Sequence, residues 1–365
     1  MKLSFEKSVL LNGINIAMKA VSTRTTMPIL ECILIDASDE EIKLTGNDME
    51  LGIETKVAGS ILEPGKIAID AKLLSEIVRK LPDSQVVIEA DEYCNVVIDC
   101  EKSSFKIAGK PGDEFSYLPY IEKDHYISLS QFTLKEMIRQ TIFSIAQGEN
   151  NKQMTGELFE VKDDFLRVIS LDGHRISIRR MKLKDHYEDE KVIVPGKTLS
   201  EVSKILSGDT DKEIVIYFTG NHILFEFDDT IVVSRLIEGQ YFNVDQMLSN
   251  DYETKISLNK REFLDSIERS MLLIRENDKK PLILTVKDQE MEAAVKSAIG
   301  SLKEDILVNK EGKDITIGFN PKFLIDALRV IDDERVDMYM VNSKAPCFIR
   351  DSEGAYIYLI LPVNI

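Results

Sequence analysis

Apolar residues follow two different periods along the chain. Runs in which every second residue is apolar, such as Glu213-Ile-Val-Ile-Tyr-Phe, predict β-strands, and short turns containing Asp, Asn or Gly separate them. Other runs place apolar residues three or four positions apart, which is the spacing of one helix face. Six segments have this helical pattern, at residues 6–20, 71–81, 131–143, 197–206, 259–275 and 320–331. The pattern therefore predicts an α+β protein with few helices and many short antiparallel strands.

The order of these elements repeats three times. A short strand opens each unit, as Lys2-Leu-Ser-Phe, Tyr126-Ile-Ser-Leu and Lys255-Ile-Ser-Leu, at a period of about 125 residues. A helix follows each opening strand, and later in each unit a second strand runs into a second helix. We therefore expect three units, each with two helices packed on antiparallel sheets in two βαβββ-like halves. Polar, turn-rich linkers place the units at 1–122, 123–250 and 251–365.

The total charge and the distribution of charge along the chain point to different conclusions about nucleic-acid binding. A net charge of -17 and a pI near 4.9 argue against a nucleic-acid partner, because Lys and Arg dominate phosphate binding. Each of the six helical segments is nevertheless net positive, by one or two charges. Solvated helix faces with ordinary Lys and Arg remain the alternative explanation. The recurrence at equivalent positions of three units favours a shared basic surface.

Repeated units suggest a use for such a surface. Repeats joined through their sheets form an arc, and a symmetric oligomer of arcs closes into a ring. Helices lining its hole would contact phosphates without reading bases, while an acidic outside would repel DNA. The candidate DNA-binding residues are Arg24, Lys72, Arg79, Lys80, Arg139, Lys197, Lys204, Arg269 and Lys322.

One segment, Asp172-Gly-His-Arg, has residue types suited to acid-base chemistry. The alternative is a tight Asp-Gly turn between strands, whose side chains shape a binding surface. We favour the turn, because its counterparts Gly46-Asn-Asp-Met and Ser297-Ala-Ile-Gly lack the His-Arg pair, so no active site is repeated. A hydrolase and a peptide-binding scaffold that does not bind DNA remain the rival classes.

Other candidate sites are weaker. Residues 59–66 look like a phosphate-binding loop, but the spacing is one residue too long and Ile67 replaces the Ser or Thr that holds magnesium, so we expect a connection between strands. The histidines outside the turn, His125, His186 and His222, are expected to be isolated, exposed loop residues.

The cysteines and the apolar content bear on cofactors and location. Cys32, Cys94, Cys100 and Cys347 form no CxxC pair, which predicts reduced, buried thiols and no metal or cofactor. No apolar run reaches the roughly 18 residues of a membrane span, and the first residues do not resemble a signal peptide. A cytoplasmic location is expected.

Several local sequences, in order along the whole chain, resemble one family. They are Arg24-Thr-Thr-Met-Pro-Ile-Leu, Leu44-Thr-Gly-Asn-Asp-Met-Glu, Leu171-Asp-Gly-His-Arg, Val192-Ile-Val-Pro-Gly-Lys, Ile317-Gly-Phe-Asn and Leu361-Pro-Val-Asn-Ile. Together they resemble the bacterial DNA polymerase III beta subunit, the replicative sliding clamp. The resemblance implies a non-catalytic processivity factor for DNA replication, which forms a ring-shaped, head-to-tail homodimer around duplex DNA.

The resemblance also implies a pocket between the second and third domains. This pocket would bind short motifs of the DNA polymerase III alpha subunit, the clamp loader and other proteins. Its residues would be Met154, Leu171, Gly173, His174, Arg175, Ile176, Phe242, Met247, Asn320, Phe323, Leu361, Pro362, Val363 and Ile365. Phe242 stands where the family typically has proline, Phe323 where it often has tyrosine, and Lys279 near a position that is aromatic in some members. We therefore expect an altered peptide preference.

Overall fold

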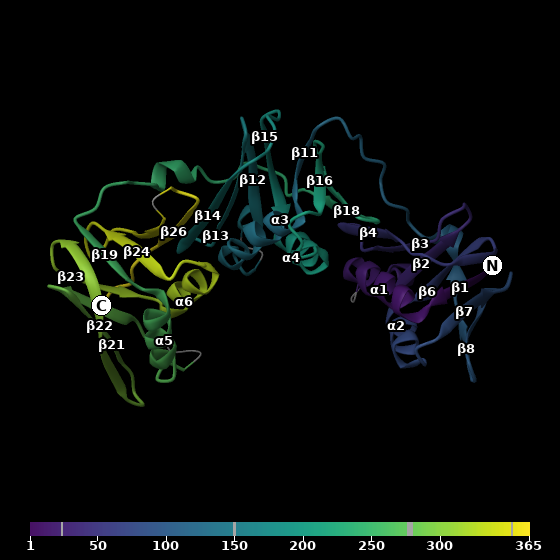
Figure 1. Ribbon diagram of the computed structural model, residues 1–365, viewed down its shortest axis with the longest axis horizontal. Helices are drawn as coiled ribbons and strands as arrows, with labels where there is room; N and C mark the ends of the chain where they lie inside the picture. The colour runs from purple at the N-terminus through teal and green to yellow at the C-terminus, as the bar shows by residue number, and fades with distance from the viewer. Residues whose placement is uncertain (23–24, 149–150, 276–279, 352) are drawn as a thin grey trace. The chain divides into compact units, whose positions relative to one another are not determined.

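The computed structural model describes residues 1–22, 25–148, 151–275, 280–351 and 353–365 of the chain. These residues form two compact units, Met1–Thr133 with Glu201–Leu236, and Leu134–Ser200 with Ile237–Ile365. The six expected helices are confirmed as α1 (Lys7–Ala17), α2 (Ala71–Lys80), α3 (Gln131–Arg139), α4 (Gly196–Ile205), α5 (Lys260–Met271) and α6 (Pro321–Val330) (Figure 1). The expected antiparallel strands fill most of the rest.

The first unit contains two antiparallel sheets. The smaller has the order β5 (Ser60–Glu63), β1 (Lys2–Glu6), β7 (Gln85–Ala90), β8 (Asn95–Cys100) and β9 (Ser103–Ala108). The larger runs β10 (Lys110–Pro111), β6 (Gly65–Asp70), β2 (Cys32–Ala37), β3 (Lys43–Asn47), β4 (Leu51–Lys56), β18 (Thr230–Arg235), β17 (His222–Phe227), β16 (Glu213–Phe218) and β11 (Tyr126–Ser130). Pairing of β4 with β18 thus joins strands of the first and second repeats into one sheet.

Helices α1 and α2 pack against each other and against the sheets of the first unit (Figure 1). Their apolar faces, which include Leu10, Ile14, Leu74 and Val78, are fully buried in one core. The Asp70 carboxylate accepts a hydrogen bond from the Leu73 amide at 2.7 Å, which satisfies one of the free amides that begin α2. The opposite face of α2 is left to solvent and carries the basic residues.

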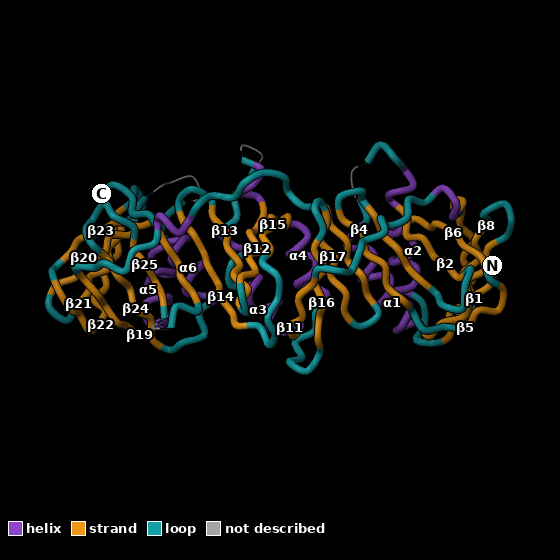
Figure 2. The backbone as a smooth tube through the Cα atoms, turned by 90° about the horizontal axis from the view of Figure 1, so that it is seen from above, coloured by secondary structure: helices purple, strands orange, loops and turns teal. Residues whose placement is uncertain are grey.

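The second unit is built on one twelve-stranded antiparallel sheet. Its order is β15 (Glu190–Pro195), β12 (Gly156–Lys162), β13 (Phe165–Leu171), β14 (Arg175–Lys182), β26 (Tyr356–Ile360), β25 (Cys347–Arg350), β24 (Arg335–Met340), β19 (Thr254–Asn259), β22 (Ser301–Gly312), β21 (Glu290–Lys296), β20 (Leu282–Lys287) and β23 (Ile315–Phe319). The first four lie side by side in Figure 2. Pairing of β14 with β26 again joins neighbouring repeats.

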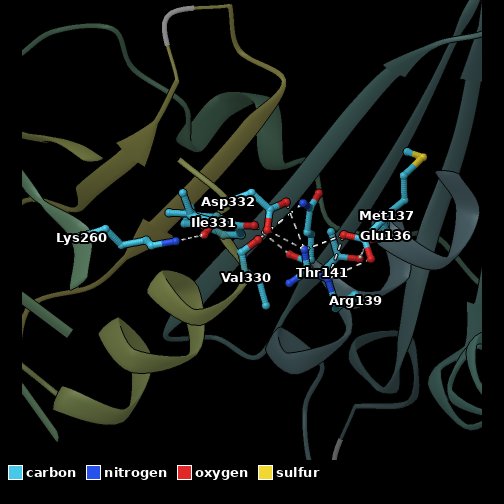
Figure 3. A network of polar contacts seen from close by, with 10 residues as sticks. Glu136, Met137, Arg139, Thr141, Lys260, Val330, Ile331 and Asp332 are labelled. Atoms are coloured by element: carbon cyan, nitrogen blue, oxygen red, sulfur yellow. Dashed lines mark hydrogen bonds and ion pairs between the residues drawn. The ribbon is translucent and has the colours of Figure 1, made fainter. Parts of the chain in front are cut away.

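Helices α5 and α6 pack side by side over this sheet, and their core contains Phe263, Ile267, Leu324 and Leu328. The end of α3 contacts the chain that follows α6 through polar groups (Figure 3). Strand pairing links each repeat to the next, and this contact links the second repeat to the third. The second repeat is therefore divided between the two compact units. The boundaries near residues 122 and 250 stay a prediction.

Several local expectations can be compared with the structure. Residues 28–31 form a short 3-10 helix that starts with proline, and the strand that follows begins at Cys32. The segment resembling a phosphate loop is not a phosphate loop, but the expectation of a mere connection is also wrong: residues 60–63 form β5, which pairs with β1, and Gly65 already begins β6. His125 and His186 are exposed in loops, but the expectation for His222 is wrong. It begins β17 and is partly buried, because the strand starts one residue earlier than the turn suggested.

The thiols largely match expectation. Cys32, Cys100 and Cys347 are buried, and burial raises the pKa of the Cys347 thiol to about 12. Cys94 is partly exposed, in a turn, with a φ of 62°. Within the described ranges, no group of three potential ligands could hold a metal ion, and no helix is long and apolar enough to cross a membrane.

Candidate functional site: an apolar pocket and basic helix faces

The turn between β13 and β14 is held by its own aspartate. An oxygen of Asp172 accepts hydrogen bonds from the amides of His174 and Arg175, at 3.0 and 3.1 Å. Gly173 has a φ of 87°, a left-handed conformation that glycine adopts without a steric penalty. The turn presents the exposed His174 ring to Phe323 of α6, with ring centroids 6.1 Å apart and planes 23° from parallel. The expected turn is therefore confirmed, and its histidine forms part of the exposed surface next to Phe323.

Arg175 lies beneath this turn and is only 8% exposed. Its guanidinium contacts Asp172 at 2.9 Å and Asp326 at 2.7 Å, and donates to the Phe143 carbonyl at 2.7 Å. The guanidinium also lies 4.5 Å from the centre of the Phe323 ring. Because all three nitrogens have partners within the protein, the main role of Arg175 is to hold the turn against α6.

The carboxyl-terminal tail runs past this turn. The Leu361 amide donates to the His174 carbonyl at 2.9 Å, and the Val363 amide donates to the Gly318 carbonyl of β23 at 2.8 Å. Leu361 and Val363 are each 36% exposed, and Ile365 is 66% exposed. Two backbone hydrogen bonds thus fix the tail while its apolar side chains stay accessible, which makes one wall of a shallow apolar site.

Residues near the start of β14 and the 237–248 segment form an apolar cluster beside the turn. Leu171 and Ile176 are each 5% exposed, and they belong to one apolar cluster with the partly buried Met154 and Phe242. Met247 is 51% exposed at the end of a short 3-10 helix, Val244–Met247, whose first residue is in the same cluster. The structure therefore brings the predicted pocket residues into one region of the second unit.

Two predicted residues act on the backbone, and two contributors were missed. The Asn320 side chain accepts from the Lys322 amide at 3.1 Å and caps α6, which positions Phe323 one turn later. Pro362 is half-buried between the two tail hydrogen bonds.

The sequence did not indicate Asp326 or Phe143, the partners of Arg175. The only signal for Asp326 was its place three residues after Phe323, on the same helix face.

A buried carboxyl group lies close to this site. Glu157 of β12 is fully buried, and this burial raises the pKa of its carboxyl to about 8, against a smaller opposing effect of the Thr141 hydroxyl. Its neighbour Tyr241 donates to the Gly156 and Ile169 carbonyls, at 3.4 and 3.3 Å. Tyr241 also packs edge-on against Phe242. A mainly neutral Glu157 is therefore buried next to Tyr241, which packs on Phe242 of the apolar cluster.

The basic candidates divide into two groups. Three of them already have carboxylate partners: Arg139 binds Glu136 and Asp332 (Figure 3), Lys204 binds Glu201 at 2.7 Å, and Arg269 binds Glu304 at 2.7 Å. The others in the described part of the chain are exposed: Lys72, Arg79, Lys80, Lys197 and Lys322. Arg24 lies outside the described residues.

The exposed group is best suited to phosphate contact. Lys72, Arg79 and Lys80 lie on one helix, α2, and neither they nor Lys322 has a carboxylate within ion-pair distance among the residues described. Such groups give up no ion pair when they bind a phosphate, and Arg79 would give up only a 3.3 Å hydrogen bond to the Ser75 hydroxyl. Lys72, Arg79 and Lys80 therefore form the clearest basic face of the first unit.

Comparison with known proteins decides the family. Models of the N-terminal, central and C-terminal domains of the DNA polymerase III beta subunit match residues 1–119, 128–243 and 245–364, in that order. The chain belongs to the DNA polymerase III beta subunit family.

Relatives from this family cover the full chain. The beta sliding clamp of Staphylococcus epidermidis is 33% identical over 100% of this chain and 99% of its own. A DNA polymerase III beta subunit structure from Eubacterium rectale is 64% identical with a TM-score of 0.97, and both chains are completely covered. The Bacillus subtilis sliding clamp is 34% identical with a TM-score of 0.96, over 100% of this chain and 99% of that one. The three repeats are therefore clamp domains, and the chain is a sliding clamp, a processivity subunit without catalytic activity of its own.

Proposed function

We propose that this sliding clamp closes as a head-to-tail homodimer around duplex DNA, with domains at 1–122, 123–250 and 251–365, and works in the cytoplasm. Two sheet edges support closure. Among the residues that the structure describes, β9 has a neighbour on one side only, and residues 301–307 of β22 are paired only with β21. An unpaired strand edge is a template for another strand.

The two edges are chemically complementary. β9 carries the exposed Lys106 and the 38% exposed Phe105, while the free part of β22 carries the exposed Asp305. Leu272, directly after α5, is 79% exposed and supplies an apolar neighbour for Phe105 in the partner subunit. Two such strand pairings, one at each end of each subunit, would close a ring of two chains.

Exposed basic groups would hold DNA within this ring. Lys72, Arg79, Lys80, Lys197 and Lys322 present ammonium and guanidinium groups that bind phosphates of any sequence. Arg139, Lys204 and Arg269 would contribute less, because a carboxylate already neutralises each of them. Weak, non-specific contacts of this kind allow the ring to slide.

The apolar site of the second unit would tether other proteins. A short peptide can place apolar side chains against Leu171, Ile176 and the tail, with Phe323 and His174 at its side. Anchors of this kind dominate the affinity of small interfaces. We propose that the polymerase III alpha subunit, the clamp loader and other DNA-processing proteins bind here, and that Phe242 in place of proline changes the preferred motif.

Topology provides the test of the DNA function. The clamp is loaded by its clamp loader on a nicked circular duplex, purified by gel filtration, and then cut once with a restriction enzyme. A ring stays on the intact circle and slides off the linear product, so the half-life should fall at least about tenfold after cutting. Equal half-lives on both DNA forms would show ordinary binding and contradict encirclement. No retention on either form would favour a peptide-binding scaffold.

A further inference from the structure

The first unit contains a second copy of the backbone frame that forms the pocket in the second unit. The turn Asp48–Glu50 lies between β3 and β4, as the turn of Asp172 lies between β13 and β14. An oxygen of Asp48 accepts from the amides of Glu50 and Leu51, at 3.0 and 2.7 Å. The turn is thus closed by the same pair of side-chain hydrogen bonds.

The strand that follows also corresponds. The Arg235 amide at the end of β18 donates to the Glu50 carbonyl at 2.9 Å, as the Leu361 amide at the end of β26 donates to His174. β4 pairs with β18 as β14 pairs with β26, in antiparallel register from the residue after the turn. Arg235 therefore occupies the position of the first tail residue.

This frame encloses a cavity of about 270 Å³. The turn contributes Met49 and Glu50, the linker after the first repeat contributes Tyr117, Leu118 and Pro119, and the second repeat contributes His222, Val233 and Arg235. The volume lies just below the range of about 300–1,000 Å³ that is typical of small-molecule sites. It suits one or two side chains of a peptide better than a cofactor.

Part of the cavity wall is apolar, and two of its side chains are held in place. Met49 and Tyr117 are each 53% exposed. The Tyr117 hydroxyl accepts from the Lys66 ammonium at 3.1 Å, and Leu118 packs so closely on Gly52 that an added Cβ would lie 2.0 Å from its Cδ2. The site is therefore preformed, and binding would bury apolar surface with little ordering of the walls.

The backbone conformation of Met49 is a separate observation that points to a binding site. Its φ is 75°, a left-handed conformation that is unfavourable for a residue with a side chain, while the equivalent Gly173 adopts 87° at no such cost. A glycine would serve the turn better. The strained residue instead places an exposed thioether chain on the cavity, and backbone strain of this kind is concentrated at binding sites.

We propose that this cavity is a second peptide-binding site, which takes a large apolar side chain next to a carboxylate. The carboxylate would bind Arg235, which is 52% exposed and has only a long contact of 4.0 Å with Glu50. His222 at the rim is held mainly neutral, because burial and the nearby Arg235 lower its pKa. The choice of a peptide as the occupant rests on the proposed function of the equivalent site in the second unit. The existence of the cavity does not depend on that proposal.

Methionine methyl groups report on the two sites separately. The full-length dimer, labelled with [¹³C-methyl]methionine and assigned by single Met→Leu substitutions, is titrated with the peptide Gln-Leu-Ser-Leu-Phe bearing a free carboxyl terminus. Met154 and Met247 report on the pocket of the second unit, and Met49 on the new cavity. We expect Met49 to shift in a saturable way with a dissociation constant about ten- to a hundredfold above that of the first site. An unchanged Met49 signal up to millimolar peptide would overturn the proposal.

Substitutions at the rim test the chemistry. Arg235→Gln should weaken peptide binding at Met49 about fivefold or more, and amidation of the peptide should have a similar effect. The matched variant Glu50→Gln removes the competing carboxylate, and should leave this affinity equal or tighter. Equal affinities for both variants and both peptides would overturn the proposed carboxylate contact.

The two sites can fail independently. In a chain lacking residues 361–365, Met49 should shift over the same range of peptide concentration as in the intact chain, while Met154 and Met247 should shift only at higher concentrations. Loss of the Met49 shift in that variant would show that it arises from the first site, and would overturn the new site while leaving the proposed function intact. Met49→Gly, which the geometry of Gly173 shows to be compatible with the turn, should remove one of two peptides per chain in calorimetry. An unchanged stoichiometry would contradict the second site.

Discussion

Arg175 and Asp326 form an ion pair with 2.7 Å between Nη1 and Oδ2, and the arginine side chain is only 9% exposed. The pair connects the turn after β13 to α6, and so fixes the position of Phe323 relative to His174. Removing one partner of such a pair leaves a desolvated charge, which costs more than an exposed pair is worth.

Asp326→Asn should therefore lower the free energy of unfolding by about 1–3 kcal/mol and weaken peptide binding about tenfold. Chemical denaturation and calorimetric titration measure the two effects. Asp332→Asn is the matched control, because Asp332 is 75% exposed where it contacts Arg139 and should contribute less than about 1 kcal/mol. Equal effects of the two variants would contradict a structural role for the buried pair.

Deletion of residues 361–365 should reduce binding of polymerase and loader peptides by about 1–4 kcal/mol, because it removes the apolar wall formed by the tail. The ring should still form and still encircle DNA. Calorimetric titration of the intact and shortened dimers with a Gln-Leu-x-Leu-Phe peptide measures the difference. If both bind equally well, the tail only completes the sheet at Gly318.

Reversal of charge at four basic helix positions should shorten the residence of the clamp on circular DNA and make its salt dependence shallower, equally for unrelated sequences. The variant carries Glu at Lys72, Arg79, Lys197 and Lys204. A control with the same change in net charge carries Glu at four exposed positions on strands or in loops: Lys162, Lys182, Lys287 and Lys313. Residence times that are the same for both variants would rule out a specific basic lining.

Phe105→Arg should convert the dimer into a species with the 41.4 kDa mass of one chain at micromolar concentration. The reason is that a charged side chain on β9 cannot be buried against Leu272 of a partner subunit. Leu62→Arg is a suitable control, since Leu62 is 58% exposed on β5, which lies at the opposite edge of the same sheet from β9. Light scattering distinguishes them, and a dimer mass for the Phe105 variant would count against pairing through β9.

Glu157 should make the protein less stable as pH rises. Its pKa is raised from 4.5 to about 8 by burial, so between these values the native state holds a proton that the unfolded chain has released. The free energy of unfolding then falls by about 1.4 kcal/mol per pH unit across this window. Glu157→Gln should remove this slope and be the more stable form near pH 8, whereas Glu92→Gln, at an exposed turn position, should not. Parallel pH profiles for wild type and the Glu157 variant would refute the assignment.

The local elements followed from the sequence to a large extent. Apolar residues three or four positions apart, such as Leu74 and Val78 in α2, predicted each of the six helices. A helix that packs on a sheet must bury one stripe of side chains, and this spacing produces such a stripe. The Asp-Gly dipeptide at Asp172 identified the turn, because its carboxylate and its left-handed glycine act within four residues. Three copies of one pattern identified the repeats. These features depend on interactions close along the chain.

Only the tertiary structure decided which charges are free and which residues share a site. Lys72 and Arg139 look alike in the sequence, but Arg139 binds both Glu136 and Asp332 in the fold, and the second partner is 193 residues away along the chain. His222 was expected in an exposed loop, and instead lines a cavity with Met49 and Tyr117. Strand pairing between repeats brings such residues together, and neither periodicity nor residue type records which strands will pair. The sequence therefore determined the three repeats and their helices and strands, and long-range strand pairing determined which residues share a site.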